Sequence, residues 1–480
     1  MTPKQVADLG VARLALPVPM AKLAAIQAIA RALDNAATAE NFADALVKWI
    51  GTRELESQCL EAICPLLLST TTPSLIARIR SAISRPSLAS DLLLSMATGN
   101  PVIVPSWSGC HSGPAPALLD LEQEENELSE GRIIPRVFAG NLEDLEDRSG
   151  HLFLRQWAFE YSVLKGRAKG KKDGYLEYFL GSERKNVCPL LPHSGHLARS
   201  AYLRTLACAV DHWGMPTDMA VEFAACACPA EPIFLKLAPQ APPDWAQQVH
   251  AHTSAKPFDP QMLATTVIQQ IEGSQQRCIM HCSLVVVDEA RFHAELEVFA
   301  VVPTKPDMDA QTCLGFYSHL LGTATPSRDG LRAFVSPKVS NKGTAPLGFV
   351  PLVLPLIGSS LGYLQFDLLG RVPYMPVSTK NVPRLELIAE PSSTILRDGN
   401  RAVGKWNWWL WNWKPSHPAN WPPPIACCTN LDLEVAQQLA KDLGGQLEHV
   451  WKLTTWQRDQ DYGEWHAMEH FGRRQVTLAV

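Results

Sequence analysis

Apolar side chains recur every three or four positions through the first hundred residues, which predicts a series of short amphipathic helices. In residues 20–33, for example, Leu23, Ile26 and Ile29 fall on one helical stripe. The same spacing predicts further helices over residues 42–50, 54–67, 73–79 and 88–96. Short helices joined by a few residues pack as antiparallel hairpins, so we expect a helical-hairpin domain over residues 1–100.

Residues 101–150 interrupt this pattern. Glycine and proline punctuate the first half and predict loop, and ten acidic residues gather between positions 120 and 147. A run of carboxylates this dense is typical of a solvated helix face or a linker, so we expect a loop and acidic linker here. Helical periodicity returns at residues 151–165, 196–213 and 217–226, which predicts a mainly helical middle domain over residues 151–260.

From about residue 261 the pattern changes to the two-residue alternation of strands. Phe292, Leu296 and Val298 alternate with His293 and Glu295, as in a strand with one buried face. Runs rich in Val, Leu and Phe predict strands at residues 277–287, 292–302, 331–335, 361–368, 384–389, 425–429, 447–456 and 475–480. With a helix over residues 433–443, they predict a β-rich α+β domain over residues 261–480.

Residues 405–421 of this domain, KWNWWLWNWKPSHPANW, carry six tryptophans. With a period of two, Trp406 and Trp408 share one face, while Trp409, Trp411 and Trp413 share the other. A strand that is large and apolar on both faces has no side suited to water. We therefore expect a central strand clamped between two layers, or a strand that packs against a domain interface.

Together the patterns predict an α+β multi-domain chain, with a helical N-terminal domain, a mixed middle and a C-terminal β-rich region around the Trp-rich strand. The short paired helices of residues 1–100 are similar in outline to a HEAT or armadillo solenoid. A compact bundle is the alternative, because no consensus recurs at a fixed period. A length of 480 residues also exceeds what one hydrophobic core usually supports.

Composition narrows the function classes. A formal net charge of −5 and a pI near 6.3 argue against a general binder of nucleic acid or anionic membranes. The longest apolar run, residues 347–361, contains two prolines and is too short to cross a membrane. The first twenty residues lack the pattern of an export signal, and twelve scattered cysteines suit buried free thiols. We expect a cytoplasmic location.

Two groups of side chains have the composition of a metal site, and zinc is the ion that they suit. The groups are His466, Glu469 and His470 in HAMEH, and Cys278, His281 and Cys282 in CIMHC. The first would place its histidines on one face only if it were helical. In the second, strand alternation separates His281 from the two cysteines. We therefore expect packing roles at both groups and no cofactor, with zinc as the alternative.

Two further groups are candidate contact residues. A basic stretch after the helix at residues 151–165 suits contact with phosphate or nucleic acid, although such Lys- and Gly-rich loops are commonly only solvated. Its members are Lys165, Arg167, Lys169, Lys171 and Lys172. Among the tryptophans, Trp421 and Trp465 are the ones we expect at the surface, where an indole can anchor a partner.

Motifs for catalysis are incomplete, so no catalytic residue is assigned. GNRAVGK at residues 399–405 has the spacing of a phosphate-binding loop, but Trp406 stands where the metal-binding hydroxyl is needed. HSGH at residues 193–196 and CHSG at 110–113 put nucleophiles directly beside histidines. A base must reach its nucleophile across space and be oriented by a third group, which adjacent residues seldom achieve.

These observations predict a non-enzymatic protein-interaction or scaffold module that binds a protein partner and no membrane. The stack of short helices offers an extended contact surface, and the Ala- and Leu-rich helices suggest one component of a bacterial multi-gene system. The rival hypotheses are a metal-assisted hydrolase that uses one of the two metal groups, and a nucleic-acid or ligand sensor that uses residues 165–172 and exposed tryptophans.

Overall fold

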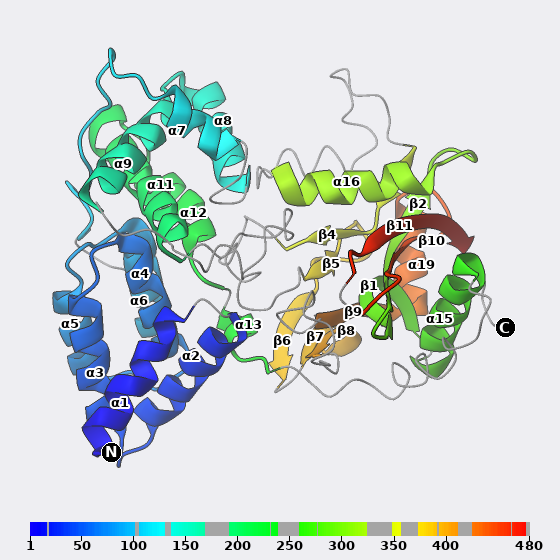
Figure 1. Ribbon diagram of the computed structural model, residues 1–480, viewed down its shortest axis with the longest axis horizontal. Helices are drawn as coiled ribbons and strands as arrows, with labels where there is room; N and C mark the ends of the chain where they lie inside the picture. Colours follow the sequence, from blue (N-terminus) through cyan, green and yellow to red (C-terminus); the bar gives the residue numbers. More distant parts are fainter. Residues whose placement is uncertain are drawn as a thin grey trace. The chain divides into compact units, whose positions relative to one another are not determined.

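A computed structural model describes residues 1–16, 19–100, 105–129, 136–168, 192–230, 232–238, 259–275, 277–323, 348–356, 373–390, 393–410, 425–461 and 463–476 (Figure 1). The described chain divides into two compact units, one built within Met1–Lys236 and the other beginning with Leu237–His319 and including the later sheet. The first unit is helical and the second is built on antiparallel strands, which confirms the predicted α+β multi-domain class.

The helical unit consists of short helices in chain order, with brief 3-10 turns between some of them. Its α-helices are α1 (Pro3–Ala12), α2 (Pro19–Asp34), α3 (Ala39–Gly51), α4 (Glu56–Ile63), α5 (Pro73–Ala82), α6 (Leu88–Thr98), α7 (Glu122–Ser129), α8 (Arg136–Ser149), α9 (Phe153–Arg167), α11 (Pro192–Trp213), α12 (Thr217–Ala224) and α13 (Pro232–Leu235). The expected acidic linker thus contains two helices, α7 and α8. Both pack with α9.

Local sequence signals explain where these helices begin and how closely they approach. Thr2 caps α1 and Ser87 caps α6, each with a reciprocal capping box that satisfies free backbone N–H groups. Gly10 lets α3 approach α1, because a Cβ atom there would lie 3.0 Å from the Phe42 ring. The helices predicted between residues 20 and 96 are present, with residues 64–67 as a 3-10 turn, and α1 is a further helix that the sequence analysis did not single out.

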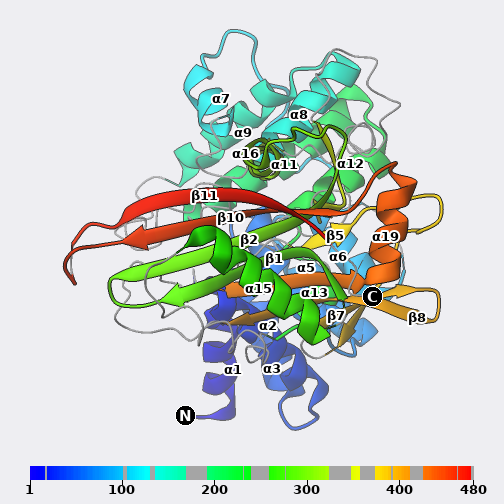
Figure 2. The same cartoon turned by 90° about the vertical axis from the view of Figure 1, so that its right-hand side faces the viewer.

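The second unit contains a nine-stranded sheet whose main path runs β11-β10-β2-β1-β9-β8-β7-β6, with β3 pairing on β2 (Figure 2). Every pairing described is antiparallel. The strands are β1 (Arg277–Asp288), β2 (Phe292–Pro303), β3 (Phe349–Pro351), β6 (Glu386–Glu390), β7 (Ser393–Asp398), β8 (Arg401–Leu410), β9 (Ile425–Asp432), β10 (Glu448–Gln457) and β11 (His466–Gln475). A separate pair joins β4 (Val353–Pro355) to β5 (Tyr374–Pro376).

Helices cover this sheet on both faces. Helix α15 (Pro260–Gln275) contributes Ala264, Val267 and Ile268 to a core cluster that includes Val298 of β2. The next residue of β2, Phe299, stacks on Tyr317 of α16 (Ala310–Thr323) at 3.9 Å between ring centroids. Neighbouring residues of a strand point to opposite faces, so α15 and α16 lie on opposite sides. Helix α19 (Leu433–Asp442) joins β9 to β10.

The tryptophan segment forms β8, which lies between β7 and β9. Trp406, Trp408 and Trp409 are fully buried, as expected for a central strand that is covered on both faces. Trp411 and Trp413 lie outside the described residues. So do the strands predicted at residues 331–335 and 361–368.

The last strand differs from the prediction. A strand that the sequence did not predict, β11, spans His466–Gln475 and forms one end of the strand order. Residues 477–480 of the strand predicted at 475–480 lie outside the described residues. The residues of β11 are mostly exposed without alternation, so the two-residue pattern that marks a half-buried strand is missing. Among the described helices, none is long and apolar enough to span a membrane.

Candidate functional site

The proposed HAMEH metal group lies on β11, where its members do not converge. On a strand, His466 and His470 are separated by about 13 Å along one face, given about 3.3 Å per residue. Glu469 points to the other face and forms an ion pair with Lys452 of β10 at 3.4 Å. The shared face that a helix would have given these histidines is absent, because the segment is extended.

The CIMHC group lies on β1, and its side chains also separate. The ring of His281 packs against Phe299 and Tyr374, with centroids 4.8 and 4.3 Å away. Cys278 instead contacts His449, and Cys282 lies in the apolar core with α15. The strand register shifts between Ile279 and His281, so the expected alternation is interrupted within this group. His281 nevertheless packs against aromatic rings and not with the two thiols.

The described part of the basic stretch belongs to α9. Lys165 forms an ion pair with Glu127 of α7 at 3.4 Å and lies 5.3 Å from the Tyr161 ring centroid. Arg167 is exposed near the end of the helix. Lys169, Lys171 and Lys172 lie outside the described residues. One contact between the acidic and basic segments thus exists within the helical unit.

The two tryptophans expected at the surface have different outcomes. Trp465 is partly exposed and its indole lies under the guanidinium of Arg458, 4.5 Å from the ring centroid. That cation–π contact packs the ring onto its own unit. Trp421 lies outside the described residues.

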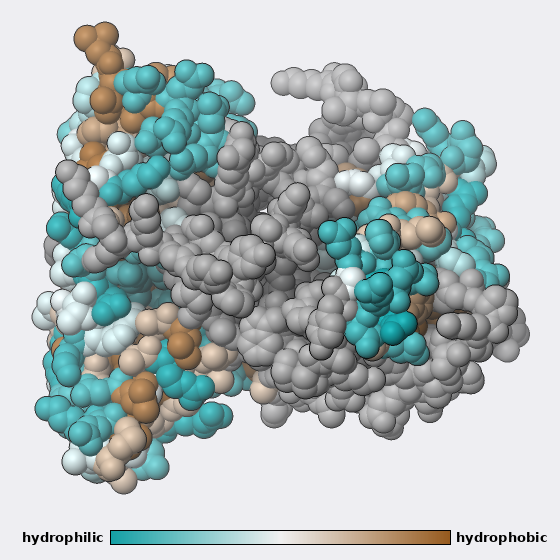
Figure 3. All heavy atoms as spheres, in the orientation of Figure 1, coloured by the Kyte–Doolittle hydropathy of each residue, from teal (hydrophilic) through white to brown (hydrophobic). Residues whose placement is uncertain are grey.

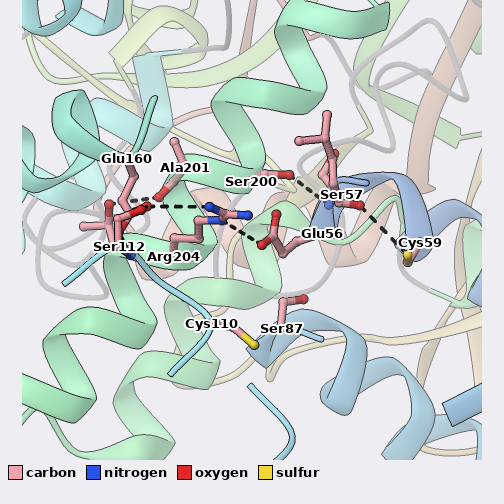
Figure 4. Close-up of polar contacts among 12 residues, drawn as sticks. Glu56, Ser57, Cys59, Ser87, Cys110, Ser112, Glu160, Ser200, Ala201 and Arg204 are labelled. Carbon is pink, nitrogen blue, oxygen red and sulfur yellow. Dashed lines mark hydrogen bonds and ion pairs between the residues drawn. The ribbon is translucent and has the colours of Figure 1, made fainter. Parts of the chain in front are cut away.

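A buried network of charged and hydroxyl groups, which the sequence did not reveal, joins α4, α9 and α11 (Figure 4). Arg204 of α11 donates from Nε to Oε1 of Glu56 at 2.7 Å, and its Nη1 lies 3.8 Å from Oε2 of Glu160. Glu160 also accepts from the backbone N–H of Ser112 at 2.6 Å and from its hydroxyl at 2.8 Å. One buried guanidinium therefore holds two carboxylates from different helices.

Charge in this network is unbalanced, with one cation between two acids. Burial raises the pKa of Glu56, and the nearby Arg204 opposes that shift without cancelling it. Oε2 of Glu56 is buried without a hydrogen-bond partner among the described atoms. The position of Glu56 in the first turn of α4 is otherwise favourable, since the helix N-terminus stabilises negative charge.

Beside this network lies a second buried group that contains a serine, a histidine and a carboxylate. Oγ of Ser57 is 2.5 Å from Nδ1 of His196, across 139 residues of sequence. Nε2 of His196 is 4.0 Å from Oε1 of Glu61, which also pairs with Lys22 at 2.6 Å. Burial, followed by the charge of Arg199, holds the pKa of His196 well below its ordinary value, so the ring is neutral.

This combination contains the groups of a nucleophile–base–acid triad. Access is what it lacks, because Ser57 has no exposed surface and a substrate atom cannot reach its hydroxyl in this arrangement. The group instead ties α4 to α11, with the Ser57 backbone N–H donating to Ser200 at 3.1 Å. His196 belongs to the HSGH motif, but its partner is this distant serine.

Within the described residues, two sets of side chains bring potential metal ligands within 4.8 Å of one another. The first is His111, Cys208 and His212 in the helical unit. Both ring nitrogens of His111 already have partners, since Nδ1 accepts from the Gly113 N–H at 2.9 Å and Nε2 is 3.1 Å from Asp211. That histidine has no lone pair to offer without breaking a hydrogen bond.

The second set is Glu272, Cys278 and His449 in the sheet unit, from α15, β1 and β10 respectively. His449 is completely buried, and its Nε2 lies 2.8 Å from the carbonyl oxygen of Ile279. The Cys278 sulfur is 3.8 Å from the same nitrogen, and Oε1 of Glu272 is 3.6 Å from Nδ1. Burial lowers the pKa of His449 to about 4 and raises the pKa of Glu272.

One sequence signal could have indicated His449. It occupies the same alternating row as Leu447, Trp451 and Leu453, so it is a polar side chain in an apolar stripe of a predicted strand. Its partners are not deducible from that pattern, because Cys278 is 171 residues away. In comparisons with known proteins, no family model and no curated protein matches the sequence.

Proposed function

We propose that the protein is a non-enzymatic interaction module that binds a protein partner on the outer face of α1. The carrying observation is that α1 is apolar on two opposite sides. Ala7, Val11 and Leu14 are buried against the helical unit. On the other side, Val6 is 47% exposed and Leu9 is 58% exposed. Leu16, which follows the 3-10 turn after the helix, is also 40% exposed.

Such a helix is unusual at a protein surface, where one apolar stripe normally faces the core and the rest is polar. Val6 and Leu9 are three residues apart and therefore neighbours on the helix surface. Full burial of a Val or Leu side chain is favourable by about 1.5–3 kcal/mol, so a partner that covers both gains substantial free energy. Figure 3 shows hydrophobic residues among hydrophilic ones over this part of the helical unit.

The partner is expected to present an apolar face, since grouped exposed apolar residues mark binding surfaces. Helix α1 packs closely on α3 where Gly10 meets Phe42, and an exposed ion pair joins Lys48 to Asp8 at 3.4 Å. A rigid helix lowers the entropy cost of binding. We place this encounter in the cytoplasm, which suits the buried free thiols among the described residues, and within a bacterial multi-gene system.

The test uses the full chain in its own cells, with a photo-crosslinking amino acid at Leu9. We expect a discrete crosslinked product with a second protein, and a complex in size-exclusion chromatography that Leu9→Asp dissociates. Leu118→Asp is the matched control, because Leu118 is a fully exposed leucine of the same unit outside α1. The proposal fails if position 9 gives no crosslink, or if Leu9→Asp and Leu118→Asp leave the complex equally intact.

A further inference from the structure

We propose that the sheet unit holds a zinc ion between Nδ1 of His449, Oε1 of Glu272 and the sulfur of Cys278. These side chains come from β10, α15 and β1, so the site exists only in the folded unit. The proposal is independent of the α1 surface. It replaces the ligand sets suggested by the sequence, and it retains only Cys278 from them.

The first argument is the state of the His449 ring. A carbonyl oxygen can only accept, so the 2.8 Å contact with Ile279 requires the hydrogen to be on Nε2. The lone pair is then on Nδ1, and that nitrogen is buried with no hydrogen-bond partner among the described atoms. A histidine that donates one N–H to a backbone carbonyl and offers its other nitrogen has the arrangement of metal-bound histidines.

The second argument is that two acceptors face each other. Oε1 of Glu272 lies 3.6 Å from Nδ1 of His449 and also lacks a hydrogen-bond partner within the described chain. Its other oxygen, Oε2, already accepts a hydrogen bond from Nη1 of Arg474 at 3.3 Å. Leaving a buried polar atom unsatisfied costs about 1–3 kcal/mol. A positive species between the two atoms, either a proton or a metal ion, removes this cost for both.

The third argument is the sulfur of Cys278, which favours a metal over a proton. Each of the three side chains offers a ligand atom, and these atoms lie within 4.8 Å of one another. The Cys278 sulfur lies 3.8 Å from Nε2 of His449 and 3.4 Å from the carbonyl oxygen of Ile279. Tetrahedral zinc with ordinary bond lengths requires separations of about 3.3–3.6 Å, so the sulfur turns toward Nδ1 when the site closes. A thiolate and a carboxylate balance the charge of a divalent ion, and mixed N, O and S ligands suit zinc.

Three protein ligands leave one tetrahedral position for water or another donor. Glu272 is the partly exposed member of the set, with about a fifth of its side chain accessible, so the ion can enter from its side. The set of His111, Cys208 and His212 differs, because both ring nitrogens of His111 already have hydrogen-bond partners. It therefore provides an internal comparison that also contains a cysteine and a histidine but has no carboxylate.

The experiment measures bound metal in the purified full chain and follows cobalt substitution by absorption. We expect about one zinc per chain, and a thiolate-to-cobalt charge-transfer band. Cys278→Ser should abolish the band and weaken zinc binding on the order of 100-fold. Glu272→Gln, a near-isosteric change at a partly exposed residue, should weaken zinc binding while the chain stays folded.

Two controls make the result decisive. Cys282→Ser changes another buried thiol of the same strand, and His111→Asn changes the other candidate set; both should retain zinc. The proposal is overturned if the folded wild-type chain binds neither zinc nor cobalt at micromolar concentrations, which would leave a shared proton between Glu272 and His449. It is equally overturned if Cys278→Ser and Glu272→Gln bind zinc as tightly as the wild type.

Discussion

Two buried polar groups, one in each unit, differ in how their atoms are paired. In the helical unit, Arg204 donates to Glu56 and lies near Glu160, and Ser57 is hydrogen-bonded to His196, although Oε2 of Glu56 has no hydrogen-bond partner among the described atoms. In the sheet unit, Nδ1 of His449 and Oε1 of Glu272 are two acceptors that face each other. A buried polar group whose donors and acceptors are paired is accounted for by the fold alone. Two acceptors that face each other are relieved by a positive species between them, and this is the basis of the proposed zinc site.

The largest loss of stability is expected when Arg204 is removed from its buried network with Glu56 and Glu160. Arg204→Met leaves Glu56 and Glu160 buried without their guanidinium, and breaking such a buried pair costs about 3–5 kcal/mol. Urea unfolding should show this loss in the helical unit. Arg31→Met, at an exposed arginine of α2, should change stability by less than about 0.5 kcal/mol. Equal effects of both substitutions would show that the network does not hold the helices together.

Acidification tests whether the buried His196 ring is neutral in the folded protein. The neutral ring of His196 is favoured in the fold, whereas the unfolded chain takes up the proton near pH 6.5. The unfolded state therefore binds more protons below that pH, and stability falls by about 1.4 kcal/mol per pH unit because of this ring. Stability curves of wild type and His196→Gln should converge between pH 6.5 and 5.5. Parallel curves would contradict the neutral assignment, and His212→Gln provides an exposed control on the same helix.

Ser57 distinguishes a structural from a catalytic role for the same group. Ser57→Ala removes the hydroxyl that is hydrogen-bonded to Nδ1 of His196 and leaves that buried nitrogen unsatisfied, which should cost about 1–3 kcal/mol. Because Ser57 is buried, a fluorophosphonate probe should not label it in the folded wild-type chain. Stoichiometric labelling at Ser57 would show that its hydroxyl is accessible. The group of Ser57, His196 and Glu61 would then be a candidate active site.

The smallest stability effect is expected at α1. Leu9→Ser shortens a side chain that already faces solvent, so the free energy of unfolding should change by less than about 0.5 kcal/mol. Val11→Ser on the buried side of the same helix should destabilise the unit by several times as much. Similar losses in thermal unfolding would mean that Leu9 is packed, and the proposed contact surface would disappear.

Local patterns predicted much of the fold. The helices of residues 20–96 follow the stripes seen in residues such as Leu23 and Ile26, and β1, β2 and β10 lie where apolar runs predicted strands. Strand β11 was missed because it is mostly exposed at the edge of the sheet, so its sequence lacks the alternating apolar residues of a half-buried strand. Its pairing with β10 depends on the partner strand rather than on its own residues.

The candidate sites were less predictable, since they depend on contacts distant in sequence. Cys278 was recognised as a soft ligand, but its neighbours in sequence are not its neighbours in space. Ser57 and His196 meet across 139 residues, and Cys278 and His449 across 171. Strand register and helix packing bring these residues together. Neither can be derived from local patterns in a single sequence.

Anomalous diffraction from crystals of the full chain, recorded on both sides of the zinc absorption edge, tests the contrast between the buried polar groups of the two units most directly. We predict one peak within bonding distance of His449 Nδ1, Glu272 Oε1 and the Cys278 sulfur, and no peak at His111, Cys208 and His212. A zinc-supplied crystal with no density between His449 and Glu272, or with its peak at the His111 set, would contradict the account.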